Sequence, residues 1–254
     1  MIEALHFKDE KTDKFWFVET LVCEMMVNYG KTGTTGKYEI KEFDNKQDCE
    51  KEALKLINSK KKKGYEEFVE FDRNNHYYFD DEEYGLNPLT SHPTFRKYFS
   101  DEIYYDCGDE EAPFGSDEGH DAFSELEESV RKKKKINFFD FPRVIIEEIW
   151  EMDYLTPDLE KTDEELKEQA KRKYNGLLGD QIILQSDQVI LAVTFGQAKI
   201  TGKIDKDLLE LALKSLNRMD KLNRLIWKWG KEEATYYIET MRKDLIKYKE
   251  DFLN

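Results

Sequence analysis

The spacing of apolar residues changes along this chain, and that change limits the folds open to it. Before about residue 45, aromatic and β-branched residues form short or alternating runs, as in residues 15–22, which suits half-buried strands. From Ser116 onward, apolar residues recur at helical spacing. Strands followed by helices are typical of an α+β chain. We therefore expect an N-terminal antiparallel sheet followed by a mostly α-helical domain.

The first part should contain one helix packed on its sheet. Its expected elements are strands at residues 15–22, 25–29 and 38–42, a helix from about 45 to 63, and a last strand at 65–71. Asp44 or Asn45 can cap the helix, and its apolar stripe includes Cys49 and Ala53. This pattern predicts an α+β domain that covers residues 1–75.

Acidic residues are concentrated in the middle of the chain. The net charge is −15, and residues 64–130 hold 20 acidic against 3 basic side chains, a net of −17. The flanking segments, 1–63 and 131–254, each have a net charge of +1. We expect residues 76–254 to form an acid-rich, mostly helical domain. Its helices should span about residues 116–135, 142–152, 162–174, 186–200 and 205–216, with a helical tail over 221–252.

The N-terminal segment resembles the WGR domain. The residues that carry the resemblance are Lys14-Phe15-Trp16, the run from Val27 to Gly36, Lys41-Glu42-Phe43, Ala53 and Lys62-Lys63-Gly64-Tyr65. Tyr29-Gly30-Lys31 stands where the family usually has Trp-Gly-Arg. In poly(ADP-ribose) polymerases this domain contacts DNA near a break, with the tryptophan against a nucleotide and the arginine as a cationic contact.

The resemblance implies that Tyr29 would stack on a base or sugar and that Lys31 would meet a phosphate. Tyrosine offers less ring area than tryptophan, and lysine lacks the planar fork of arginine. The region from His92 to about residue 220 is similar to bacterial YfeS-type proteins, which also carry a WGR domain. That likeness rests on His92-Pro93, residues 112–121, Phe195-Gly196-Gln197 and Gly202, and it implies no activity.

The candidate nucleic-acid contacts form two groups. They are Tyr29, Gly30 and Lys31 in the signature, and Lys60, Lys61, Lys62 and Lys63 at the end of the expected helix. A lysine run can neutralise phosphates, although it also suits the negative end of a helix dipole. The same alternatives apply to residues 131–135. Gly30-Lys31-Thr32 is not a phosphate-binding loop, because Met25 stands where that loop needs its first glycine.

Asp117, His120 and Asp121 are the candidate special site of the second domain. Carboxylates beside an imidazole could bind a divalent cation or share a proton. Acids are also favoured at a helix N-terminus, and we prefer that interpretation because no further ligand follows at a recognisable spacing. The chain contains no Gly-x-Ser-x-Gly, HExxH or CxxC motif. We therefore expect a non-enzymatic binding protein without a cofactor.

Two hypotheses for the partner remain. In the first, the N-terminal domain binds DNA or RNA. In the second, the acidic surface of residues 64–130 docks a basic protein, as an adaptor or immunity protein would. The N-terminus lacks the apolar core of a signal peptide, and the longest apolar run, residues 189–193, is too short to span a bilayer. We expect a cytoplasmic protein with three free cysteines and no membrane contact.

Overall fold

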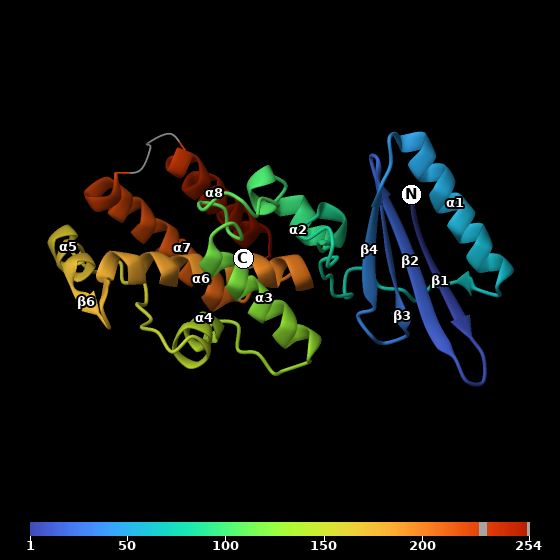
Figure 1. Cartoon of the computed structure of the whole chain (residues 1–254), viewed down its shortest axis with the longest axis horizontal. Helices are drawn as coiled ribbons and strands as arrows, with labels where there is room; N and C mark the ends of the chain where they lie inside the picture. The colour runs from blue at the N-terminus through green and yellow to red at the C-terminus, as the bar shows by residue number, and fades with distance from the viewer. Residues whose placement is uncertain (229–232, 253–254) are drawn as a thin grey trace. The chain divides into compact units, whose positions relative to one another are not determined.

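The computed structural model describes residues 1–228 and 233–252, and the chain divides into two compact units, Met1–Pro93 and Thr94–Asn254. The first unit contains β1 (Ile2–Lys8), β2 (Asp13–Leu21), β3 (Glu24–Lys31), β4 (Lys37–Glu42), α1 (Lys46–Lys62), β5 (Glu66–Glu67) and the 3-10 turn η1 (Pro88–Thr90) (Figure 1). The helical region begins with α2 (Pro93–Tyr98), η2 (Glu102–Tyr104), α3 (Asp117–Arg131), α4 (Phe141–Val144) and η3 (Ile145–Ile149). It continues with α5 (Asp163–Lys171), the hairpin β6 (Lys173–Tyr174) and β7 (Leu177–Leu178), α6 (Gly179–Thr201), α7 (Lys206–Leu222), η4 (Asn223–Trp227) and α8 (Glu233–Phe252).

The first unit is built on a five-stranded antiparallel sheet with the order β4-β3-β2-β1-β5. The expected α+β class is confirmed. Two strands differ from the expectation: β1 was not specified, and the strand expected at 65–71 is reduced to the two residues of β5. The chain after β5 leaves the sheet, and Phe68 and Phe71 pack on one another instead.

Helix α1 covers one face of the sheet, as Figure 1 shows. Asn45 caps the helix by accepting a hydrogen bond from the backbone N–H of Asp48, which satisfies one of the donors that a helix start leaves free. The buried cluster between helix and sheet contains Leu5, Trp16, Val18, Met25, Cys49, Ala53 and Ile57. Since strand side chains alternate, the odd-numbered residues of β1 and β3 and the even-numbered residues of β2 face the helix.

The opposite face of the sheet is covered by the irregular chain that follows β5. Phe71 lies 4.9 Å from Phe17, ring centroid to centroid. The Tyr38 hydroxyl donates to the carbonyl oxygen of Tyr77 at 2.7 Å, and the Ile40 N–H donates to the Asp81 carboxylate at 2.7 Å. The last bond occupies a donor of the edge strand β4, which would otherwise be open to another strand. The irregular chain up to Pro93 therefore belongs to the same compact unit as the sheet.

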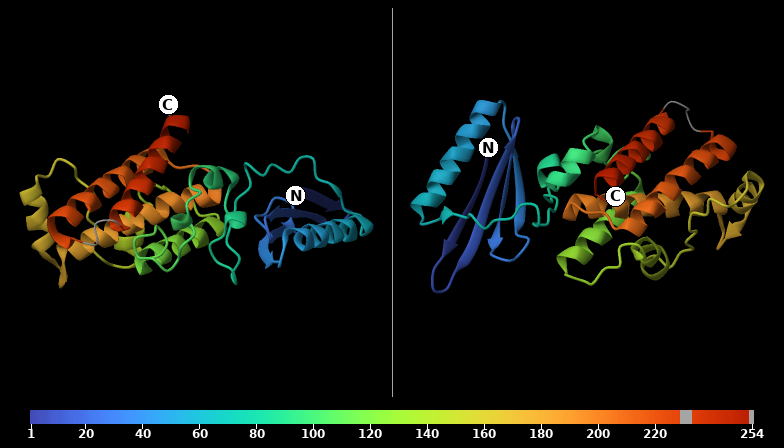
Figure 2. Two further views of the ribbon diagram at one scale, coloured as in Figure 1. Left: turned by 90° about the horizontal axis from the view of Figure 1, so that it is seen from above. Right: turned by 180° about the vertical axis from the view of Figure 1, so that it is seen from behind.

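The second unit is arranged around α6. This helix contacts α3, α4, α5 and α7, and it runs through the middle of its unit in both views of Figure 2. It is buried over most of its length, as expected for a helix that is apolar nearly all round. Ser116, Thr162 and Asp205 cap α3, α5 and α7, and Thr162 does so with a full capping box.

Two expected helices contain π-helical turns. The helix expected over 142–152 is one α-helical turn followed by the π-helical turn η3, and Glu151 then adopts a positive φ. The tail expected over 221–252 includes the π-helical turn η4 before α8, and residues 229–232 of it lie outside the described residues. None of the described helices is both long and apolar enough to cross a bilayer.

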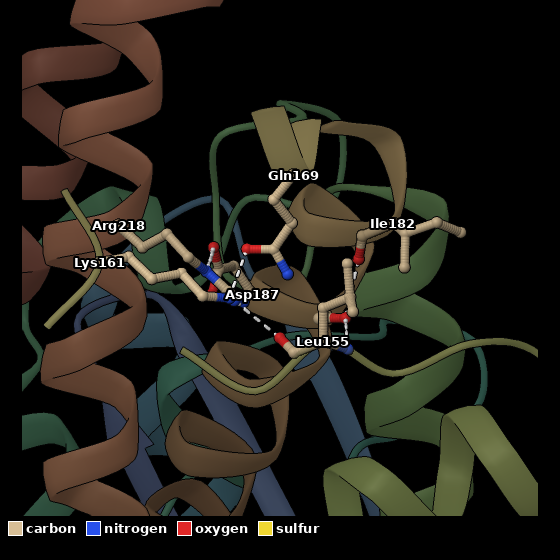
Figure 3. A network of polar contacts seen from close by, with 7 residues as sticks. Leu155, Lys161, Gln169, Ile182, Asp187 and Arg218 are labelled. Carbon is tan, nitrogen blue, oxygen red and sulfur yellow. Dashed lines mark hydrogen bonds and ion pairs between the residues drawn. The ribbon is translucent and has the colours of Figure 1, made fainter. Parts of the chain in front are cut away.

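A buried ion pair joins α6 to α7. The Arg218 guanidinium donates to both carboxylate oxygens of Asp187, at 2.8 and 3.0 Å, and to the carbonyl oxygen of Leu155 at 2.7 Å (Figure 3). Both charged side chains are almost inaccessible, with 3% and 0% of their area exposed. The pair therefore fixes two helices and the extended segment around Leu155 in one arrangement.

Helix α8 is attached to the acidic segment before α3 through tyrosine hydroxyls. Four tyrosine–aspartate bonds join them: Tyr98 to Asp251 at 2.6 Å, Tyr104 to Asp244 at 3.0 Å, Tyr236 to Asp101 at 2.8 Å and Tyr237 to Asp109 at 2.5 Å. Each hydroxyl donates to an ionised acceptor, which makes a stronger bond than a neutral pair. Part of the acidity of this segment therefore stabilises the fold of its own unit.

The buried pair gives a stability prediction. Arg218→Met leaves the Asp187 carboxylate without a cation in the interior, and we expect it to lower the free energy of unfolding by about 3–5 kcal/mol. Combining Arg218→Met with Asp187→Leu should recover most of the loss, since no unpaired charge remains. Urea unfolding followed by far-ultraviolet circular dichroism measures both values. A single-variant loss below about 1 kcal/mol would show that water screens this pair.

Candidate nucleic-acid interface

The signature Tyr29-Gly30-Lys31 forms the end of β3. In the register of β2 and β3, Tyr29 lies opposite Trp16 and Lys31 lies opposite Lys14. Cross-strand partners point to the same face, so Tyr29, Lys31 and Lys14 all lie on the face that carries α1. Trp16 is buried beneath the helix, whereas 36% of Tyr29 is exposed. The tyrosine ring therefore stands at the rim of the helix-covered core.

The turn after the signature is fixed by close backbone packing. A side chain at Gly30 would approach the Cα of Gly36 to 2.9 Å, and one at Gly36 would approach Phe15 Cζ to 2.7 Å. Gly36 also has a φ of 71°, which strongly favours glycine. The Asn28 side-chain amide donates to the carbonyl oxygens of Thr35 and Lys37 at 3.0 and 3.2 Å. These contacts define the path of the chain on either side of Lys31.

His76 supports this turn from the opposite face of the sheet. Its Nε2 lies 2.9 Å from Asn28 Oδ1, and because the Asn28 nitrogen already donates twice, its oxygen accepts and His76 donates. Burial lowers the pKa of His76 to about 4, although a hydrogen bond to the backbone of Thr35 opposes the shift. His76 is therefore neutral at physiological pH, and it connects the chain after β5 to the signature turn.

The end of α1 brings Lys60 to the same face. Its ammonium lies over the rings of Trp16 and Tyr65, 5.5 and 5.2 Å from their centroids. Partial burial there, together with the nearby Lys63 and Lys14, lowers the pKa of Lys60. Lys14, Lys60 and Lys63 are therefore near enough to repel one another electrostatically.

We call Lys14, Lys31, Lys60 and Lys63 the basic corner. Lys14, Lys31 and Lys63 are exposed, and none of the four forms an ion pair with another residue in the part of the chain that the structure describes. Sequence reasoning missed Lys14, which the register of two predicted strands could have identified. Lys61 is engaged by Glu3 at 2.7 Å, and Lys62 is exposed beside the corner.

Tyr29 has a specific partner on β4. Its hydroxyl donates to Glu39 Oε1 at 2.7 Å, and the Lys37 ammonium reaches the same oxygen at 2.9 Å. Lys37 lies directly opposite Tyr29 in the register, and Glu39 lies one pair away on the same face. The Glu39 carboxylate thus pairs with Lys37, which does not belong to the basic corner, and holds the hydroxyl of Tyr29.

The candidate site of the second unit is not brought together. Asp117, His120 and Asp121 are exposed on the first turns of α3. Within residues 1–228 and 233–252, no three His, Cys, Asp or Glu side chains are grouped so that they could hold a metal ion. Local packing explains much of residues 112–121: Ser116 caps α3, and a side chain at Gly115 would collide with the carbonyl oxygen of Asp109.

The second basic run lies at the end of α3. Residues 131–135 are exposed, and Lys132 forms an i,i+4 ion pair with Glu128. The N–H groups of Lys133 and Lys134 donate to the carbonyl oxygens of Val130 and Ser129, which is the bonding pattern that closes a helix C-terminus. This run therefore has a structural explanation within its own unit.

Comparison with known proteins agrees with this architecture. Residues 1–72 match the model of the WGR domain, a domain type generally associated with nucleic-acid binding, so the first unit contains a WGR domain. The chain is 42% identical over 239 residues to the uncharacterized protein YfeS of Escherichia coli (strain K12), covering 94% of this chain and 95% of that protein. The protein belongs to the YfeS family of WGR-domain proteins.

Other similarities are shorter. The protein YehF of the same E. coli strain is 44% identical over 61 residues, which are 24% of this chain and 22% of YehF. A crystal structure of a Bacteroides fragilis protein is 27% identical, covers 44% of this chain and 36% of its own, and has a TM-score of 0.27. That score is too low to support a structural argument.

The signature turn gives a second prediction. We expect Gly36→Ala to destabilise the first unit by about 3 kcal/mol, because the added carbon meets Phe15 and the positive φ is disfavoured. Gly33→Ala is the matched control: its φ is also positive, at 81°, but nothing lies near its added carbon, so about 1 kcal/mol is expected. Urea unfolding compares the two. Equal losses would show that the turn has room at Gly36.

His76 makes stability depend on pH. Its folded pKa of about 4 lies below the unfolded value of about 6.5, so the unfolded chain binds the proton first as pH falls. Stability is therefore full above about pH 6.5 and declines by up to about 3 kcal/mol toward pH 4. Urea unfolding across this range should show the decline, and His76→Gln should remove that part of it. A parallel decline in both proteins would assign it to other groups.

Proposed function

We propose that this protein binds nucleic acid through the basic corner of its WGR domain and that it does so without catalysing a reaction. The observation that carries the proposal is the convergence of Lys14, Lys31, Lys60 and Lys63, from two strands and a helix end, beside the exposed ring of Tyr29. A cationic surface with an aromatic platform is the usual means of contacting a phosphate backbone and its bases.

The corner is electrostatically unfavourable when empty. Lys14 and Lys31 are direct cross-strand partners, and like charges in that position destabilise a sheet. The pKa of Lys60 is lowered by its burial and by the neighbouring lysines. A polyanion would relieve both effects, since its phosphates would supply the missing countercharge. Binding should therefore be sensitive to salt.

The net charge of −15 does not oppose this proposal strongly. Electrostatic interactions in water fade over about 8 Å at physiological ionic strength, so the lysines of the corner matter more than distant acids. Several acids are also engaged within their own unit, such as Asp81 at the edge of β4 and Asp109 on Tyr237.

The alternative, in which the acidic surface docks a basic protein, has less support. The acids of residues 64–130 are divided between the two compact units, because the first unit ends at Pro93. Asp101, Asp109 and Asp81 are hydrogen-bonded to their own unit. A basic protein partner is therefore the outcome to pursue if nucleic acid is not bound.

The proposal predicts salt-sensitive binding of oligonucleotides. The probes are fluorescently labelled single-stranded, blunt and nicked DNA and single-stranded RNA, titrated by anisotropy at low and physiological salt. We expect Lys14→Ala and Lys31→Ala to weaken binding and to lower the salt slope by about one unit each. Tyr29→Ala should weaken it about tenfold through lost stacking.

The matched control is Lys46→Ala, which removes the same charge from the other end of α1, about 20 Å away at the usual helical rise. It should leave affinity nearly unchanged. An equal effect of Lys46→Ala and Lys31→Ala would indicate a diffuse charge effect. No binding of any probe at low salt would overturn the proposal, and a pull-down with the acidic chain as bait would follow.

A further inference from the structure

Glu39 is an acid beside the surface that we propose for a polyanion. It lies on the helix-facing side of β4, its side chain is 46% exposed, and its carboxylate contacts the hydroxyl of Tyr29 at the rim of the basic corner. An exposed carboxylate beside a phosphate path repels the phosphates. A binding surface built for charge alone would have a neutral or basic side chain here.

The contacts of Glu39 are specific. Both Tyr29 and Lys37 donate to the same oxygen, Oε1, at 2.7 and 2.9 Å. The hydrogen bonds from Tyr29 and then Lys37 lower the pKa of Glu39, and the bond to Glu39 raises the pKa of Tyr29. Both pKa shifts favour the state in which the neutral phenol of Tyr29 donates to the ionised carboxylate of Glu39. A hydrogen bond to an ionised acceptor is stronger than one between neutral groups.

This bond fixes the direction of the Tyr29 ring. One side of the residue is bounded by its cross-strand partner Trp16, which is buried, and the other by Lys37. With the hydroxyl also held, the ring has little freedom to turn. A side chain that is already ordered costs less entropy when a ligand packs against it.

Tyrosine also differs from the usual tryptophan of this signature in a way that makes the bond useful. A tryptophan ring is wider and can be held by packing over its larger surface, whereas the smaller ring of a tyrosine on a solvent-exposed rim gains less from packing. Its hydroxyl offers a single point at which the ring can be fixed. Glu39 supplies the acceptor for that point.

We infer that Glu39 is a positioning residue for the nucleotide contact: it holds the Tyr29 ring in the binding orientation and keeps Lys37 away from the phosphate path. This inference rests on the proposed function. The stacking surface is thus prepared before the ligand arrives. The phosphates of the polyanion contact Lys14, Lys31, Lys60 and Lys63. None of these phosphates lies on the side of the Tyr29 ring that faces β4.

Two neutral replacements separate this role from charge. Glu39→Gln and Glu39→Ala both remove the negative charge and the ion pair with Lys37, but only glutamine keeps an oxygen that can accept from Tyr29. The probe is labelled nicked duplex DNA at low salt. We expect Glu39→Gln to bind about fivefold more tightly than Glu39→Ala. In the glutamine variant the Tyr29 ring is already held, whereas in the alanine variant it has to be ordered when DNA binds.

The same pair is then measured with Tyr29→Phe, which removes the donor. We expect the affinity ratio between the glutamine and alanine replacements to fall to about 1, because phenylalanine cannot use the acceptor. Circular dichroism melting curves of the four proteins are the folding control. Both positions are substantially exposed, so all four should retain the fold.

The outcomes are distinguishable. If the unmodified protein binds no probe, the proposed function and this inference both fail. If it binds in a Lys31-dependent manner and the two Glu39 replacements bind equally, only the inference fails. A ratio that persists with Tyr29→Phe would also overturn it, because Glu39 would then act independently of the ring.

Discussion

The pairing of β2 with β3 determines what the first unit can present to a ligand. Trp16 is buried against Ala53 and Ile57 of α1, and this fixes the register in which Tyr29 lies opposite it. A slip by one residue would turn Tyr29 and Lys31 to the other face of the sheet, where Phe71 and its neighbours leave no access. The burial of one tryptophan therefore places the signature on the accessible side.

The two faces of the sheet contribute differently to the candidate site. The helix-covered face presents Tyr29 and the basic corner, whereas the opposite face supports the turn through Asn28 and His76. His76 lies beyond residues 1–72, the part matched by the WGR domain, but within the first compact unit. In this chain the signature turn thus depends on a segment outside the family match, because buried polar groups need partners from somewhere in the fold.

Local signals were enough to predict some features and not others. The cap of α1 could be narrowed to Asp44 or Asn45 because a short polar side chain bonds to its own neighbouring backbone, and Asn45 is the cap. The strand β1 was not specified. Glu3, Leu5 and Phe7 share one face of this strand, but three positions are too few to make an alternating pattern stand out. The π-helical turns η3 and η4 could not be predicted, because one extra residue in a turn leaves the apolar pattern nearly unchanged.

Contacts distant in sequence account for the rest. Lys14 was not identified as a site residue because its role becomes evident only when β2 and β3 are paired, which places it opposite Lys31. The extension of the first unit to Pro93 depends on bonds such as Tyr38 to Tyr77, between residues that carry no common motif. The acidic run of residues 64–130 misleads for the same reason, because the sequence does not show which carboxylates are bonded to residues far along the chain.

Some carboxylates of the acidic segment are engaged inside the fold. Asp109 and Asp101 receive hydrogen bonds from tyrosines of α8, and Asp81 closes an edge of the sheet. The lysines of the basic corner, in contrast, come from segments with a combined net charge of only +1, yet they gather on one face without acidic partners among the described residues. What a ligand meets at short range is this local arrangement, since screening removes most of the influence of the distant charges. The strong overall acidity of the chain is therefore compatible with the proposed polyanion site at the basic corner.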